Sequence, residues 1–108
     1  MKEINEETIY ELPFGISEMG VKGYQAIMEF LRKKDLVWSG FSENGRVFQA
    51  PKAANQVLIV SYEGSKHGKA FSYDYGQYSI VEAMEKELEK IGLYSEQINS
   101  TSSGIYVI

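Results

Sequence analysis

The chain has 108 residues, of which 44% are hydrophobic, and it contains no cysteine. A chain of this length buries roughly two-thirds of the surface that it exposes when unfolded, so we expect one domain spanning residues 1–108 whose core needs no disulfide. The missing cysteines exclude a thiolate zinc site and a cysteine nucleophile. The net charge of −4 disfavours a general nucleic-acid-binding protein, which needs a basic surface.

The charge is unevenly distributed along the chain. Residues 1–45 carry 5 basic and 8 acidic side chains, residues 46–69 carry 4 and 1, and residues 70–108 carry 2 and 6. A basic middle segment therefore lies between two acidic flanks. Residues 1–7 are polar, and no apolar run approaches the roughly 20 residues that span a bilayer. We therefore expect a frayed N-terminus, no membrane contact and a cytoplasmic location.

The first predicted elements are a short strand at residues 8–12 and a helix that begins after Ser17. Ser17 is the predicted N-cap, because a serine hydroxyl can accept a hydrogen bond from an amide of the first turn. Gly20 and Gly23 weaken the opening turns of this helix by roughly 1 kcal/mol each relative to alanine. The apolar residues of the helical pattern lie three or four positions apart, at Val21, Tyr24, Met28 and Leu31.

The middle of the chain predicts antiparallel strands. Residues 36–41 and 46–49 flank an Asn44-Gly45 turn, a strong hairpin signal because both turn positions need positive φ. Residues 57–62 form the strongest predicted strand, and apolar side chains at both parities indicate a central position. Residues 69–75 alternate in polarity and are predicted to pair back on that strand as a half-buried strand.

The C-terminal third predicts a helix followed by a hairpin. The helix spans about residues 80–91, with Ser79 and Glu82 as a capping box and Gly92 as its C-cap. Residues 93–98 and 105–108 are predicted to pair as strands around the polar loop between them.

These elements predict a single α+β domain: a four- to six-stranded, mainly antiparallel sheet with two amphipathic helices packed on it, in the order β-α-β-β-β-β-α-β-β. The two helix units also resemble each other, which leaves an internal duplication open. The matching positions, at one constant offset, are Ala26, Leu31, Lys33, Leu36 and Phe41 against Ala83, Leu88, Lys90, Leu93 and Ile98.

Residues 64–70 are glycine-rich and basic. They resemble a P-loop, in which backbone amides and a lysine hold phosphates, but Ala70 stands where the metal-binding hydroxyl is required. The sequence therefore favours an exposed hairpin loop with a solvated His67. Lys66, His67 and Lys69 remain candidates for holding a phosphate or an acidic patch.

No catalytic or metal-binding pattern accompanies this loop. His67 is the only histidine. The sequence contains no nucleophile elbow and pairs His67 with no particular serine, and it lacks the spacing of metal ligands. We therefore expect neither an enzyme nor a cofactor.

Tyrosine is over-represented, with eight residues. A buried phenol needs a hydrogen-bond partner, so we expect Tyr62, Tyr75 and Tyr78 to reach a surface, where tyrosine supplies much contact area. Trp38 is either a core residue or a second anchor. The candidate contact residues are Tyr62, Tyr73, Tyr75, Tyr78 and Trp38, together with Lys66, His67 and Lys69.

The sequence thus predicts a small acidic binding protein that regulates or inhibits a larger protein partner by covering its surface. Small inhibitors encoded by bacteria and their phages share this size and charge. The alternative is a module that binds a nucleotide or another small phosphorylated ligand through residues 64–69 and the neighbouring tyrosines. A homodimer is also possible, because an exposed sheet edge can pair with a second copy.

Overall fold

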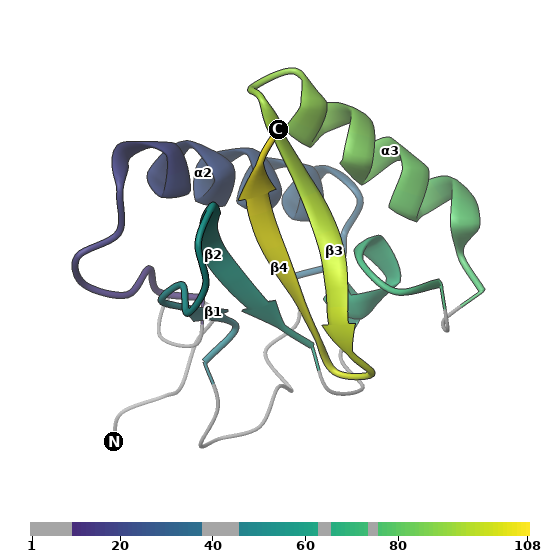
Figure 1. The fold of residues 1–108 in the computed structure, drawn as a ribbon. Helices are drawn as coiled ribbons and strands as arrows, with labels where there is room; N and C mark the ends of the chain where they lie inside the picture. The colour runs from purple at the N-terminus through teal and green to yellow at the C-terminus, as the bar shows by residue number, and fades with distance from the viewer. Residues whose placement is uncertain (1–9, 38–45, 63–65, 74–75) are drawn as a thin grey trace, which may run out of the picture.

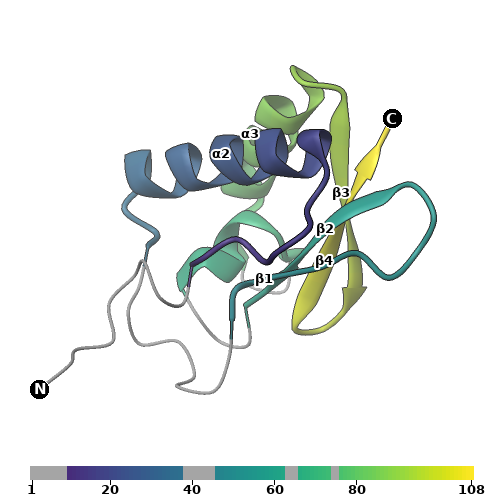
Figure 2. The same cartoon turned by 90° about the vertical axis from the view of Figure 1, so that its left-hand side faces the viewer.

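The computed structural model describes residues 10–37, 46–62, 66–73 and 76–108. It has two layers, a four-stranded antiparallel sheet and two α-helices that lie on the same face of it (Figures 1 and 2). The predicted α+β class is therefore confirmed. Residues 8 and 9, Trp38, the Asn44-Gly45 turn and Tyr75 lie outside the described residues.

The helix α2 (Glu18–Lys33) begins after Ser17, as its sequence predicts. The hydroxyl of Ser17, the N-cap, accepts a hydrogen bond from the amide of Gly20 at 3.2 Å. Its buried face carries large apolar side chains that include Ile27, Phe30 and Leu31. At the other end Asp35 adopts a left-handed φ of 57°, and the amide of Leu36 returns to the carbonyl of Leu31 at 2.8 Å.

The sheet has the strand order β1-β2-β4-β3. The strand β2 (Gln56–Ser61) lies between β1 (Phe48–Gln49) and β4 (Ser102–Val107), which confirms its central position, and β3 (Leu93–Asn99) forms an edge. The predicted last hairpin is present, but its loop is shorter than expected because β4 already begins at Ser102. The side chain of Asn99 closes this turn by accepting hydrogen bonds from the amide and hydroxyl of Thr101 and from the hydroxyl of Ser102.

The helix α3 (Tyr78–Glu89) starts earlier than its sequence indicates. Its N-cap is Gln77, which makes no side-chain capping hydrogen bond, so Ser79 lies inside the helix and the predicted capping box is wrong. The C-cap is Lys90 rather than Gly92. Gly92 instead supplies the left-handed turn into β3, with φ of 80°.

The strand predicted at residues 69–75 is wrong over its described part. Lys66–Ala70 forms a 3-10 helix, η1, and the amides of Phe71 and Ser72 both return to the carbonyl of Gly68. Ala70, Phe71 and Ser72 are consecutive and all buried, which a half-exposed strand would not allow. Residues 10–12 form no strand either, and Tyr10 packs into the core.

The core fills the space between the sheet and the helices. Leu58 and Ile105 face each other across β2 and β4 and are fully buried, as are Leu31 of α2 and Leu88 of α3. Among the described residues, no helix is long and apolar enough to cross a membrane.

Candidate interaction surface

The prediction of a solvated His67 is wrong, since the side chain is 0% exposed. Its Nε2 lies 2.7 Å from the Ser61 carbonyl, which can only accept, and its Nδ1 lies 3.0 Å from the Tyr10 hydroxyl. Burial lowers the pKa of His67 from 6.5 to about 4, although the hydrogen bond to Ser61 works in the opposite direction. At neutral pH the ring is therefore uncharged, with Nε2–H donating to Ser61 and Nδ1 accepting from Tyr10.

Tyr62 is also buried, which corrects the expectation that it reaches a surface. Its hydroxyl lies 3.0 Å from the hydroxyl of Ser103 on β4, and its ring stacks on Phe71 with 6.1 Å between centroids. Ser103 supplies inside the core the hydrogen-bond partner that a buried phenol requires. Tyr62 is therefore a core residue.

Lys66 and Lys69 belong to η1, where Lys66 is exposed and Lys69 is half-buried. Because His67 is buried and neutral, these two lysines are the described cations that remain of the basic loop. Tyr75 and Trp38 lie outside the described residues, so the structure does not place them.

Tyr73 and Tyr78 form an exposed aromatic pair next to the start of α3. Their rings lie 5.3 Å apart at an angle of 59°, and the two residues are 45% and 59% exposed. The contact between the two rings holds the segment after η1 against the first turn of α3. Of the predicted contact residues, these two are brought together at the surface.

Two carboxylates adjoin this pair. Glu82 and Glu85 follow Tyr78 by about one and two helical turns, so they share its face of α3. Desolvation, the charges of Glu85 and Glu82, and a hydrogen bond to Glu85 all raise the pKa of the Tyr73 phenol. We call Tyr73, Tyr78, Glu82 and Glu85 the tyrosine-acid surface.

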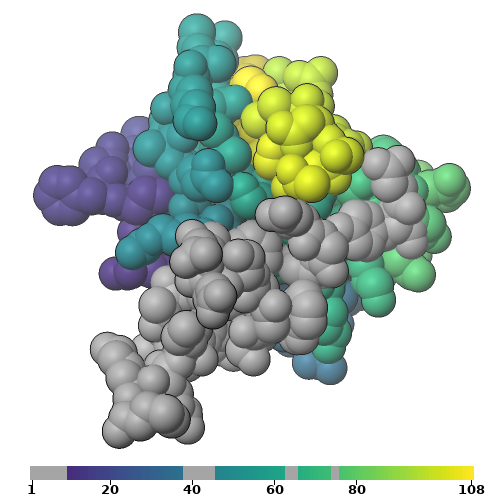
Figure 3. Space-filling view, turned by 90° about the horizontal axis from the view of Figure 1, so that it is seen from below, coloured from purple at the N-terminus to yellow at the C-terminus, as the bar shows by residue number. Residues whose placement is uncertain are grey.

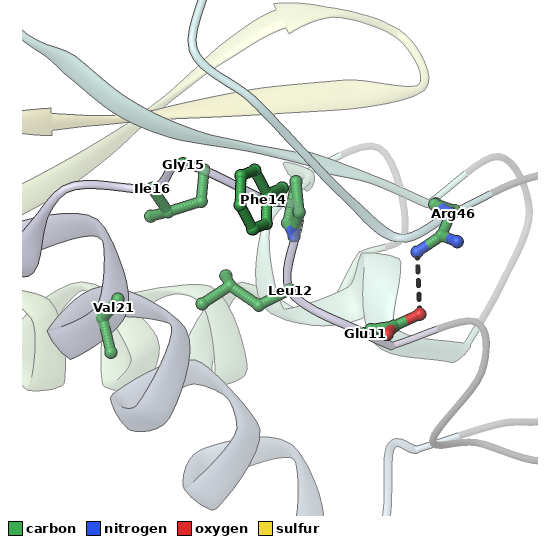
Figure 4. A pocket seen from close by; sticks show the side chains of 8 residues that line it. Glu11, Leu12, Phe14, Gly15, Ile16, Val21 and Arg46 are labelled. Carbon is green, nitrogen blue, oxygen red and sulfur yellow. Dashed lines mark hydrogen bonds and ion pairs between the residues drawn. The ribbon is translucent and has the colours of Figure 1, made fainter.

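A second surface feature was not predicted from the sequence. An open recess of about 600 Å³ lies between residues 11–16, the first turns of α2 and Arg46 (Figure 4). Phe14 stands at this recess and is 103% exposed. The purple start of the described chain projects from one side of the molecule (Figure 3). The sequence gives no periodic signal here, because the recess joins a turn to residues far along the chain.

The sheet face opposite the helices carries side chains that satisfy one another. Tyr94 and Tyr106 stack at 5.3 Å, and the amide group of Gln56 donates to the Tyr106 hydroxyl at 3.1 Å. Gln49 likewise donates to the Ser61 hydroxyl at 2.7 Å. This face thus carries aromatic side chains together with hydrogen-bonded polar ones, and its described strands contain no lysine or arginine.

Within the described ranges, no group of three or more histidine, aspartate or glutamate side chains could hold a metal ion. Comparison of the chain with protein families, with curated proteins and with solved structures finds no match. Its function must therefore be argued from its own surfaces.

Proposed function

We propose that the chain is a non-enzymatic binding protein that regulates or inhibits a larger protein by covering part of its surface. The observation that carries this proposal is the exposed Tyr73–Tyr78 pair. Tyrosine buries a large area at low cost in conformational entropy and is enriched among the residues that dominate binding energy. The tyrosine-acid surface is accordingly the proposed contact.

The charges around the pair favour a partner of opposite charge. Glu82 and Glu85 adjoin the tyrosines, and the whole chain carries a charge of −4. A basic protein surface complements these charges, and its arginine or lysine side chains can also lie on the tyrosine rings as cation–π pairs. We therefore propose that the partner presents a basic patch.

The alternative of a phosphorylated small ligand has less support. His67 is buried and uncharged, which removes one of the three groups that were expected to hold a phosphate. Tyr73 lies beside carboxylates that would repel an anion from its ring. The geometry consequently favours a protein partner over a nucleotide.

The test is affinity capture with the purified chain as bait in a lysate of its source cells. We expect one partner at a stoichiometric ratio, with Tyr73→Ala or Tyr78→Ala weakening its affinity by about 30-fold, the effect of losing about 2 kcal/mol at a dominant contact. Tyr94→Ala is the matched control, because Tyr94 is also exposed but lies on β3. The Tyr94→Ala variant should bind the partner with unchanged affinity.

A thermal-shift screen distinguishes the proposed function from the alternative, which is the binding of a phosphorylated small ligand. A ligand that binds the folded state raises the melting temperature by mass action. If nucleotides or phosphorylated metabolites raise it while affinity capture yields no stoichiometric protein, the proposed function is wrong.

A further inference from the structure

We propose that residues 10–16 form a strap that closes over His67 at neutral pH and is released from the core when His67 takes up a proton. The strap includes no residue of the tyrosine-acid surface, so its release is independent of the proposed function. Three observations support the proposal: the strap has no backbone attachment along its length, its buried anchor bonds directly to His67, and an open recess lies beside it.

The strap belongs neither to the sheet nor to a helix, and it runs from beside β1 to the start of α2 (Figures 1 and 2). Among the described residues, no backbone hydrogen bond joins residues 11–16 to any other segment. An open recess of about 600 Å³ lies between the strap and the first turns of α2 (Figure 4). Side-chain contacts therefore hold the strap in place.

Tyr10 is the buried anchor of the strap. It is 1% exposed, and its ring centroid lies 6.4 Å from that of Phe48 in β1 and 5.4 Å from that of His67 in η1. Its hydroxyl lies 3.0 Å from Nδ1 of His67. The deepest contact of the strap is thus made with a side chain that can titrate.

The other contacts of the strap are nearer the surface. Leu12 and Ile16 are half-buried against the core. Glu11 forms an ion pair with Arg46 that is exposed on both sides, and such a pair contributes little to stability. The position of the strap therefore depends strongly on Tyr10.

The two ring nitrogens of His67 respond differently to a second proton. Nε2–H donates to the Ser61 carbonyl in both protonation states, whereas Nδ1 accepts from the Tyr10 hydroxyl only while it carries no proton. Because the ring is 0% exposed, protonation also places a charge inside the core. Release of the strap brings the Nδ1 edge of the ring to water, which solvates the charge, and the bond to Ser61 can be kept.

The pKa of His67 gives the direction of the effect. Burial lowers this pKa from 6.5 to about 4 while the strap is closed, and exposure of the ring returns it toward the ordinary value. The released state consequently takes up a proton first. The closed state is fully favoured above pH 6.5 and loses this advantage as pH falls toward 4. Linkage predicts that the ratio of released to closed molecules rises about 20-fold between pH 7 and pH 5.

Other titratable groups surround this junction, and one of them belongs to the strap. Those on the described elements next to His67 are Tyr10 and Glu11 of the strap, Arg46 ahead of β1, Tyr62 after β2, Lys66 and Lys69 of η1, and Tyr78, Lys86 and the four glutamates of α3. None of these charges contributes to the lowered pKa of His67. Glu11 is the group whose own titration must be separated from that of His67, because its ion pair also holds the strap.

Nuclear magnetic resonance of the isotope-labelled chain between pH 7 and pH 4 tests the proposal. We expect the amide signals of residues 11–16, Pro13 excepted, to move toward disordered values in step with the titration of the His67 ring. The signals of β2 and α3 should keep their folded positions over the same range. If residues 11–16 keep their folded signals until the sheet unfolds, or change without titration of His67, the proposal is overturned.

Two variants separate the titration of His67 from that of Glu11. Glutamine at position 67 can donate to Ser61 and accept from Tyr10 but cannot titrate, so His67→Gln should abolish the pH-dependent release. Glu11→Gln removes the carboxylate and should leave the release in place. Release that persists in His67→Gln but disappears in Glu11→Gln would assign it to the ion pair and overturn the proposal.

A third variant tests the anchor at constant pH and does not require His67→Gln to fold. Tyr10→Phe keeps the ring on Phe48 but removes the hydroxyl that bonds to His67. We expect the ratio of released to closed molecules to rise roughly fivefold at pH 7, the effect of one lost hydrogen bond. An unchanged ratio would show that the bond between Tyr10 and His67 does not hold the strap.

Discussion

The side chain of His67 joins three segments that lie far apart in the sequence. It belongs to η1, contacts the hydroxyl of Tyr10 ahead of α2, and donates to the carbonyl of Ser61 at the end of β2. Burial favours the uncharged imidazole ring, which is also the form that accepts a hydrogen bond from Tyr10, so the stability that these contacts contribute to the fold depends on pH.

We predict that the chain loses stability as pH falls through the range of His67 titration. The folded-state pKa of about 4 lies below the ordinary value of 6.5, so the unfolded state takes up a proton first. The stabilisation is complete above pH 6.5 and is lost as pH falls toward 4. Linkage gives a loss of about 2 kcal/mol between pH 7 and pH 5, measurable by urea denaturation at both values.

The matched control for this prediction is His67→Gln. His67 is the only histidine, so no other imidazole can produce the same dependence. The variant should be less stable at pH 7 but should lose about 2 kcal/mol less than the unaltered chain between pH 7 and pH 5. Equal losses in the two proteins would show that His67 does not cause the effect.

The positions of His67 and Tyr62 could not be predicted from the sequence, because each has a hydrogen-bond partner far away in the chain. The polar loop residues around His67 indicated solvent, and the phenol of Tyr62 indicated a surface. Tyr10 and Ser103 satisfy these two groups inside the core, from opposite ends of the chain. No local pattern of residues reports such a pairing, whereas the exposed Tyr78 agreed with its local expectation.

At the scale of elements, the two helix N-termini differ in a way that can be measured. Ser17 caps α2 through the amide of Gly20, whereas Ser79 lies inside α3 and is exposed. We predict that Ser17→Ala lowers the free energy of unfolding by about 1 kcal/mol, the usual cost of a lost N-cap. Ser79→Ala should change it by less than about 0.5 kcal/mol, because alanine is favourable in a helix interior. A comparable loss for both variants would indicate that Ser79 does cap α3, which would contradict the structure.

The glycines of α2 reveal how tightly this helix approaches the sheet. A Cβ at Gly20 would lie 2.7 Å from the carbonyl oxygen of Val57 and would also meet Ile16, whereas a Cβ at Gly23 would lie 2.9 Å from the flexible end of Leu93. Alanine favours a helix by roughly 1 kcal/mol over glycine. At Gly20 the clash with backbone opposes that gain, and at Gly23 the leucine can move aside.

We therefore predict that Gly20→Ala destabilises the chain by about 1–3 kcal/mol despite its better helix propensity. Gly23→Ala, its matched control three positions along the same helix, should be close to neutral. Urea denaturation of both variants at pH 7 measures the difference. A Gly20→Ala variant more stable than the unaltered chain would mean that α2 does not approach β2 this closely.

The elements that the sequence predicted best are those whose apolar pattern extends over many residues. The spaced apolar residues of α2 and the unbroken apolar run of β2 are such patterns, and both elements were located correctly. The short segment after β2 alternates in polarity like a strand but folds as η1, because burial of Ala70, Phe71 and Ser72 on the sheet and α3 overrides its pattern. Asp35 and Gly92, which correspond in the suggested duplication, both take left-handed φ values before a buried leucine, so that hypothesis stays open.

At the scale of the whole molecule, the helices cover one face of the sheet and the two candidate surfaces lie away from the open face. The tyrosine-acid surface belongs to the start of α3, and the recess lies at the start of α2 (Figure 1). The two tyrosines of the first surface were among the contact residues predicted from a cluster of tyrosines close in sequence, whereas its two carboxylates were not predicted. The second surface could not be predicted, since Glu11 and Arg46 meet only through the fold.

The net charge of the whole molecule should affect the rate at which it binds a charged partner. If the partner is basic, the association rate constant should fall as salt screens the attraction, whose range is about 10 Å at 0.1 M ionic strength. Glu82→Lys reverses a charge beside Tyr73, and Glu29→Lys makes the same change on the exposed side of α2. Surface plasmon resonance at two salt concentrations should show a slower association for Glu82→Lys than for Glu29→Lys. Equal effects would indicate that only the net charge matters, and the absence of any salt dependence would exclude a basic partner for this surface.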